Sequence, residues 1–393
     1  MRRARRTEAF SITRDVVAPG TRLAGRVYGP IRVLRCLTES ELLEDHLGEI
    51  HVRDERRLLW LRVPTRRGIE QPEVRAQLDR EAELHQSLQH PYILRGLGRP
   101  RIDDRPALAL EYVDGRTLHR ALSIQQTSGA PMPLPTALTI GAHILEGLAF
   151  AHAKDRVHGA LVPRTILIGW QGETKLSHWG SGACHLQDAL SEQLPYLAPE
   201  LARGETPTPR SDVFAATAII IQMMSGTSFF ARVRPRATLE ALMNADRAQL
   251  DQVMPYRIPA LLDAMRTALA PDPKARAIEA EALHKLMVRS MARAGLQPNV
   301  EAAAQYMSDT FPNAAPILRR PAPRVEGRER PLHRRETLPR LNENAVQDFV
   351  QDVVSASRPS SQRTTTPDTI RAATGDMPGL ATEKKGWRRL FHR

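Results

Sequence analysis

Cysteine, lysine and long apolar runs are scarce in this sequence, and the scarcity of cysteine and of apolar runs excludes whole classes of protein. Only two of the 393 residues are cysteines, Cys36 and Cys184. Two cysteines can build neither a disulfide framework nor a structural zinc site of four cysteines. The longest nearly unbroken apolar run, Ala215 to Met224, spans ten residues, about half of what a bilayer-spanning helix needs. The sequence therefore predicts no disulfide scaffold, no structural metal and no transmembrane helix.

The N-terminus carries four arginines within its first six residues, but no apolar stretch follows them. A cleavable secretory signal needs such a stretch directly after its basic residues. The pattern therefore predicts a cytoplasmic protein. Its composition, 41% apolar and 25% charged, is typical of a chain that buries a sizeable core.

The net charge of +12 is distributed unevenly, and only six of the 56 basic residues are lysines. Residues 1–24 contribute +4 and residues 319–393 contribute +7, which leaves +1 for the part between them. A nucleic-acid-binding domain is expected to carry its positive charge on the folded part. The distribution instead predicts solvated basic tails and no nucleic-acid partner.

The N-terminal third alternates between strand and helix patterns. Apolar runs at 31–37 and 58–63 indicate strands. From Pro72 the apolar residues change to steps of three and four, which predicts a helix ending before His90-Pro91, and Glu81 lies on the apolar face of that helix. A further strand is expected at 107–113.

After Asp114-Gly115 the sequence is mostly helical, with one hairpin early in this part. The runs 165–168 and 175–177 flank two glycines, as the strands of a hairpin would. Helices are predicted at 137–154, 211–224, 258–269 and 278–294, and helical spacing recurs at 300–316.

Beyond residue 319 proline, arginine, serine and threonine dominate, which predicts a mostly disordered tail. Two segments interrupt it. Ala345–Val353 has apolar residues at helical spacing, and residues 384–393 interleave basic with bulky apolar side chains. The second segment could contact an anionic membrane surface or an acidic partner, or stay solvated.

Seven segments, in this order, resemble the landmarks of protein kinases, especially bacterial serine/threonine kinases. They are REAELHQSLQHPYIL (80–94), LALEYVDGRTL (108–118), AHAKDRVHGALVPRTILI (151–168), KLSHWG (175–180), LAPE (197–200), SDVFAATAIIIQMMSG (211–226) and PDPKARA (271–277). The match covers about residues 26–292, and seven ordered motifs are far more specific than any one alone.

The resemblance implies an α+β fold of two lobes, a small β-rich N-lobe with one helix and a larger helical C-lobe, with disordered basic tails. Its implied boundaries are a basic arm at 1–25, an N-lobe at 26–115, a C-lobe at 116–292, a helical extension at 293–318 and a tail at 319–393.

A kinase needs a cradle for the phosphates, a cation to hold them, ligands for Mg²⁺ and a carboxylate at the substrate hydroxyl. The family cradle has three glycines between its first two strands, whereas Thr38 to Ile50 offers Gly48 alone. The same segment carries five acids that would repel a triphosphate, namely Glu39, Glu41, Glu44, Asp45 and Glu49.

The family's phosphate-binding lysine corresponds to Arg62, and its carboxylate partner to Glu81. A charged residue on a core-facing stripe needs a counter-charge, so an Arg62–Glu81 ion pair is expected. The alternative is that Arg62 is an exposed strand residue. A guanidinium could contact phosphate, although its fork differs from the point charge of lysine.

Residues 151–168, which resemble the family's catalytic loop and are called the catalytic segment below, depart most from the family. Ala160 stands where the resemblance implies the catalytic aspartate, Val162 where it implies a lysine, and Thr165 where it implies a metal-binding asparagine. His178 stands in place of the principal Mg²⁺ ligand, and imidazole binds this hard cation poorly.

Positions with structural roles in the family are retained, in contrast to those that touch ATP, Mg²⁺ or substrate. They are His158, Gly180, Glu200, Asp212 and Arg276. The resemblance implies a buried Glu200–Arg276 bridge and an Asp212 that binds the catalytic segment, although Asp212 could simply cap its helix.

This selective loss predicts a pseudokinase with no catalytic residues, no metal site and no cofactor, which acts as a signalling scaffold or allosteric partner. Its expected partner is another protein, for example an active kinase or a kinase substrate. The alternative is a divergent serine/threonine kinase that uses ATP and Mg²⁺ through Arg62 and Glu81.

Overall fold

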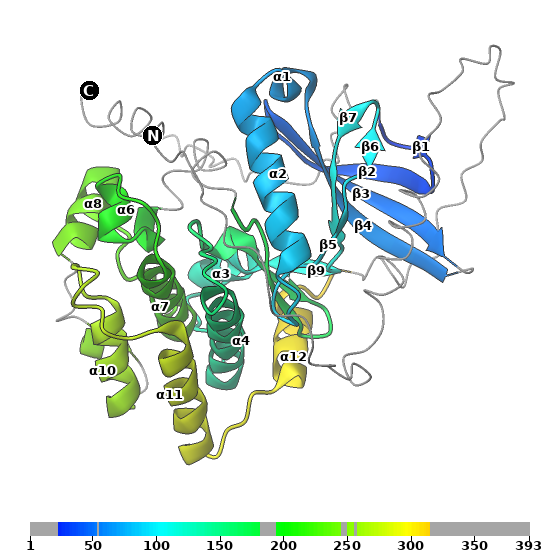
Figure 1. Ribbon diagram of the computed structural model, residues 1–393. Coiled ribbons are helices and arrows are strands. Elements are labelled where there is room, and N and C mark those ends of the chain that lie inside the picture. Colours follow the sequence, from blue (N-terminus) through cyan, green and yellow to red (C-terminus); the bar gives the residue numbers. More distant parts are fainter. Residues whose placement is uncertain (1–22, 53–54, 181–193, 245–249, 255–257, 315–393) are drawn as a thin grey trace, which may run out of the picture.

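The computed structural model describes residues 23–52, 55–180, 194–244, 250–254 and 258–314. Figure 1 shows a β-rich N-lobe, in blue and cyan, beside a larger helical C-lobe in green and yellow. The chain therefore has the predicted α+β, two-lobed architecture. Residues 1–22 of the predicted arm, the end of the predicted extension from residue 315, and the whole predicted tail at 319–393 lie outside the described residues.

The N-lobe is built on a six-stranded antiparallel sheet with the order β1-β2-β3-β4-β8-β5. Its strands are β1 (Val27–Tyr28), β2 (Ile31–Glu39), β3 (Leu43–Val52), β4 (Glu55–Pro64), β8 (Leu108–Glu111) and β5 (Gly96–Gly98). A separate two-stranded hairpin joins β6 (Arg101–Ile102) to β7 (Arg105–Pro106).

Strand β4 separates two sets of side chains, because successive residues of a strand point to opposite faces. Leu59, Leu61 and Val63 belong to the apolar cluster on one face of the sheet. Trp60 and Arg62 alternate with them and meet α2 (Pro72–Ser87) and the C-lobe. This alternation places the candidate site on the second face.

The segment Thr38–Ile50 differs from its predicted structure. The prediction was a loop containing Gly48, but β3 starts at Leu43 and Gly48 lies within the strand, opposite Leu59. A Cβ on Gly48 would come 2.6 Å from Cδ1 of Leu61, so this glycine allows close strand packing. The turn between β2 and β3 contains no glycine.

The predicted helices are present, with boundaries shifted by a few residues. They are α2, α4 (Leu134–His152), α7 (Pro209–Ser225), α10 (Pro259–Ala268) and α11 (Ala280–Arg293). The sequence patterns did not single out α1 (Arg66–Ile69), α3 (Leu118–Ser128), α6 (Pro199–Ala202), α8 (Pro235–Asn244) and α9 (Leu250–Val253).

The predicted hairpin is formed by β10 (Ile166–Gly169) and β11 (Thr174–Leu176), and β9 (Gly115–Thr117) adds a third strand beside β10. The one-turn helices η1 (Pro163–Thr165) and η3 (Leu194–Tyr196) precede β10 and α6 respectively. Helix α12 (Val300–Thr310) contacts α4, α3 and β10.

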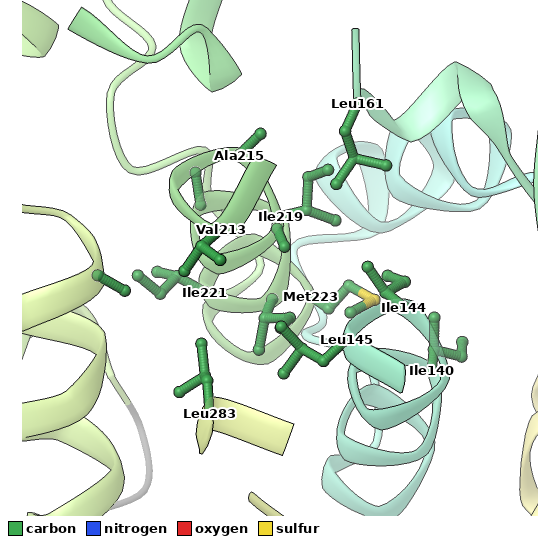
Figure 2. Close-up of a cluster of buried hydrophobic side chains, with 14 of the residues drawn as sticks. Ile140, Ile144, Leu145, Leu161, Val213, Ala215, Ile219, Ile221, Met223 and Leu283 are labelled. Carbon is green, nitrogen blue, oxygen red and sulfur yellow. The ribbon is translucent and has the colours of Figure 1, made fainter. Parts of the chain in front are cut away.

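The core of the C-lobe lies between α4, α7 and α11. Figure 2 shows Ile140 and Leu145 of α4, Ile221 of α7 and Leu283 of α11 in one cluster. α7 is buried along nearly its whole length, and starts at a capping box formed by Thr208. Only α4 among the described helices is long and apolar enough to cross a membrane, and 72% of its apolar window is buried inside the protein.

A buried ion pair joins α6 to the segment between α10 and α11. Both terminal nitrogens of Arg276 donate to the Glu200 carboxylate, at 2.6 and 2.8 Å, and its Nε donates to the carbonyl of Ala270. Ser211 donates to Glu200 as well, and the Arg276 guanidinium lies over the ring of Phe214. Burial opposes ionisation of Glu200, but these donors hold the pKa of its carboxyl below the ordinary value.

Arg276→Ala should destabilise the protein strongly. Removal of the guanidinium leaves a buried carboxylate without its cation, which costs about 3–5 kcal/mol. The free energy of unfolding, measured with urea, should fall by that amount. Arg236→Ala is the matched control, because Arg236 pairs with Glu240 at the surface of α8. Equal unfolding midpoints for the two variants would contradict a structural role for the buried bridge.

Candidate functional site

The candidate site is centred on Arg62, whose side chain is 1% exposed. Its guanidinium donates to Glu81 of α2 at 2.5 Å and to Asp45 of β3 through Nε at 2.9 Å. A second terminal nitrogen contacts Nε2 of His178, just after β11, at 2.7 Å. The expected Arg62–Glu81 pair is therefore present, and the alternative of an exposed Arg62 is excluded.

This arrangement keeps Arg62 charged. Burial alone would lower the pKa of the guanidinium, but Asp45 and Glu81 reverse that effect and raise the pKa above its ordinary value. One cation thus binds acceptors from β3, α2 and the segment after β11.

The Arg62 contact also determines the hydrogen-bonding role of His178. Nε2 faces a guanidinium that can only donate, so Nε2 must accept. Nδ1 then carries the proton and donates to the hydroxyl of Ser177 at 2.7 Å, and that hydroxyl donates to the carbonyl of Thr165. A neutral imidazole therefore relays hydrogen bonds from Arg62 to the catalytic segment.

Trp60 fills the space beside this network and was not identified from the sequence. Its ring lies 5.2 Å from the Arg62 guanidinium carbon and 5.4 Å from the His178 ring. It belongs to an apolar group that includes Val113, after β8, and Leu167 of β10. A large indole thus lies where the two lobes meet. The period of two that places Trp60 and Arg62 on one face of β4 could have revealed it.

The five acids expected to repel phosphate are for the most part paired with basic side chains. Asp45 pairs with Arg62 and Glu49 with Arg56, while Glu44 contacts His46 and Arg105. Glu41 pairs with the exposed Arg67. Three of the five lie on β3 rather than in a loop. Strands β3 and β4 thus bring acidic and basic residues together, a pairing that the sequence segment alone did not indicate.

Local hydrogen bonds engage the polar groups of one turn in the catalytic segment. The Thr165 hydroxyl donates to the carbonyl of Val162 and accepts from the Val162 N–H. It is therefore engaged within its own turn, where the resemblance implies a metal ligand. Ala160 and Val162 are each 7% exposed and bring no polar side-chain atom. No side chain at these three positions matches the role implied by the family.

Asp212 binds the backbone of the catalytic segment. Its carboxylate accepts from the N–H groups of His158 and Gly159, at 2.8 and 2.9 Å, and contacts Nε2 of His152. Thr208 caps α7. Asp212 therefore does more than cap its helix, because it binds the backbone at His158 and Gly159.

His158 and Gly180 lie at the junction with the segment 175–180. Nε2 of His158 donates to the carbonyl of Ser177 at 3.0 Å, and its ring packs on Trp179. Gly180 has a φ of 71°, and a Cβ there would come 2.5 Å from Cδ1 of Leu84 on α2. Both residues thus position the segment that carries His178.

The residues of this site do not fit a magnesium nucleotide. Metal ligands of the family are replaced by Thr165 and His178, and both are engaged in internal hydrogen bonds. Over the described ranges no group of three histidine, cysteine, aspartate or glutamate residues could hold a metal ion. The retained polar contacts join β4 and α2 to the segment after β11.

The protein kinase domain family matches residues 62–288, more than half of the chain, so this protein belongs to the protein kinase family. Its curated relatives include the serine/threonine-protein kinase PrkC of Bacillus subtilis, 31% identical over 37% of this chain and 23% of PrkC. Another is the serine/threonine-protein kinase pkn2 of Myxococcus xanthus, 29% identical over 58% of this chain and 28% of pkn2. The matches thus span about a quarter of these relatives.

Solved structures agree on the fold. The Mycobacterium tuberculosis PknI kinase domain covers 68% of this chain with a TM-score of 0.52 and 22% identity, and the match includes 98% of that domain. At this identity the likeness establishes the fold alone.

The buried histidines predict that stability falls in acid. Burial lowers the pKa of both His85 and His158 from 6.5 to about 4. Their contribution to stability is complete above pH 6.5 and is lost as the pH falls toward 4. The reason is that the histidines of the unfolded chain are protonated at a higher pH than those of the folded chain. Between pH 7 and pH 5 each histidine should lower the free energy of unfolding by about 2 kcal/mol.

Urea unfolding at the two pH values measures this loss. His85 donates to the carbonyl of Leu94 through Nδ1, a bond that His85→Gln can replace without titrating. This variant should show a weaker pH dependence than the parent. A free energy of unfolding that is constant or higher at pH 5 would contradict the prediction.

Proposed function

We propose that this protein is a pseudokinase, a kinase-fold protein that performs no phosphoryl transfer and acts as a signalling scaffold or allosteric partner. One observation carries the proposal. The Arg62 guanidinium, which corresponds to the family's phosphate-binding lysine, is bound by Asp45, Glu81 and His178. Protein groups thus take the contacts that a nucleotide would need.

Electrostatics and the catalytic segment support the same conclusion. A phosphate that approached Arg62 would have to displace Asp45 or lie beside its negative charge. Ala160 has no atom that could accept the proton of a substrate hydroxyl, and loss of a general base costs about 10²- to 10⁴-fold in rate. We therefore propose that the protein needs neither ATP nor Mg²⁺, and that its partners are proteins such as an active kinase or its substrate.

A divergent serine/threonine kinase is the second candidate. Two observations favour it, namely the retained pair between β4 and α2 and the kinase activity stated in the names of the relatives. In this case Arg62 would act as the phosphate ligand. The two candidates differ in nucleotide binding, because only a kinase must bind ATP with a divalent ion.

The purified protein should transfer no phosphate from radiolabelled ATP, with Mg²⁺ or with Mn²⁺. Ala160→Asp should remain inactive too, because it restores one carboxylate but neither the metal ligands nor a free cation. Such losses act together rather than adding up. The melting temperature should not change with ATP and either metal ion.

Arg62→Ala serves as the control in the same assay. Transfer by the parent that Arg62→Ala abolishes would overturn the pseudokinase proposal and establish Arg62 as a phosphate ligand. Transfer that persists in Arg62→Ala would point to a contaminating kinase, and a second purification would remove it.

We further propose a cytoplasmic location with a peripheral contact through residues 384–393, which lie outside the described residues. Five basic residues in this segment would attract an anionic membrane surface or an acidic partner. Trp387, Leu390 and Phe391 would supply the apolar burial.

Co-sedimentation with vesicles that contain phosphatidylserine tests the membrane contact. The double variant Trp387→Ala, Phe391→Ala should sediment less than the parent, because the basic residues alone bind weakly. Vesicles of neutral lipid provide the control. Equal sedimentation of the two proteins, or none of either, would leave the segment solvated or bound to an acidic partner.

A further inference from the structure

Two carboxylates bind the one cation of the candidate site, and they differ in their access to solvent. The side chains of Glu81 and Arg62 are each 1% exposed, whereas the side chain of Asp45 is 15% exposed. Of the two carboxylates, Asp45 is therefore the one on the solvent side of the buried guanidinium.

The Asp45 carboxylate binds the guanidinium through two hydrogen bonds. Its Oδ1 accepts from Nε of Arg62 at 2.9 Å, and its Oδ2 accepts from a terminal nitrogen at 3.2 Å. A guanidinium binds phosphate through the same paired arrangement of two N–H donors. Asp45 thus takes the pair of donors that Arg62 could otherwise offer to a phosphate.

The site has more acceptors than donors. Each side-chain nitrogen of Arg62 already has an acceptor, which is Asp45, Glu81 or His178. The second carboxylate oxygen of Glu81 is buried and has no hydrogen-bond partner among the described residues. One guanidinium also faces two carboxylates, so negative charge is in excess around it. A further anion would meet both a shortage of donors and electrostatic repulsion.

Strand register fixes the position of Asp45. It lies directly opposite Arg62 in the pairing of β3 with β4, and the hydroxyl of Thr38 on β2 donates to its Oδ2 at 3.0 Å. The other acids of β3, Glu44 and Glu49, bind different basic side chains. Asp45 is therefore the β3 carboxylate that the sheet holds against Arg62.

We propose that Asp45 is a specificity-determining residue, a built-in carboxylate that excludes phosphate-bearing anions from Arg62. This inference rests on the proposed function and adds that the exclusion of anions and the loss of catalysis are separable. Removal of the Asp45 charge should open an anion site at Arg62, while the chain still lacks a proton acceptor at Ala160.

Binding of inorganic tripolyphosphate to the full chain, measured by titration calorimetry without a metal ion, tests the proposal. Asp45→Ala should bind this anion about tenfold or more tightly than the parent, because a like charge beside an anion opposes binding. Asp45→Asn should also bind it more tightly than the parent. This second variant removes the charge but keeps an oxygen that can accept from Thr38.

Two controls isolate the contact, and urea unfolding verifies that every variant is folded. Glu49→Gln is the matched control, because Glu49 is a buried acid of the same strand that pairs with Arg56. It should bind tripolyphosphate no more tightly than the parent. The triple variant Asp45→Ala, Arg62→Met, Glu81→Gln should lose the binding gained by Asp45→Ala. It removes the charged side chains as a unit, which leaves no buried carboxylate unpaired.

Three outcomes would overturn the proposal. They are equal affinities of the parent and both folded Asp45 variants, an equal gain in Glu49→Gln, and binding that persists in the triple variant. These outcomes leave the pseudokinase proposal intact if the phosphotransfer assay is silent. Phosphotransfer by the parent would instead contradict both proposals, because an active kinase must admit the phosphates of ATP.

Discussion

The buried guanidinium of Arg62 is the interaction on which the rest of the site depends. A lysine ammonium is a compact point charge, whereas the guanidinium fork donates in several fixed directions. Here it reaches carboxylates on β3 and α2 and the imidazole of His178 after β11. The replacement of one cation by another therefore allows the protein to link both lobes through its own side chains.

The residues that hold the fold together and the residues at the positions of the family's catalytic groups have different physical surroundings. Glu200, Arg276 and Asp212 satisfy buried charges and backbone N–H groups, and their removal would expose uncompensated polar groups in the core. Ala160 and Val162 are buried apolar residues, and their side chains pair with no buried charge or backbone N–H group. The fold can thus stay packed where Ala160 and Val162 stand in place of charged residues.

Charge pairing explains why the acidic strand β3 is compatible with a folded N-lobe. The register places Asp45 opposite Arg62, and Glu49 also pairs with Arg56. The acidic residues lie close together in the sequence, which suggested repulsion of a phosphate. Their basic partners come from the next strand, and Arg62 in particular is distant from Asp45 in the sequence. The same pairing places the Asp45 carboxylate beside the Arg62 guanidinium.

The sequence by itself determined the main helices through apolar periodicity, which is a local property. The order of its motifs indicated the two-lobed fold and the Arg62–Glu81 pair through the resemblance to protein kinases. The sequence also determined that Ala160 cannot accept a proton, since that is a property of the residue. Only the tertiary structure decided that Gly48 lies within β3 rather than in a loop, that Trp60 and His178 pack around Arg62, and that Ala160 and Val162 line a cavity. These features depend on strand register and on contacts between residues far apart in the chain, for example Arg62 and His178.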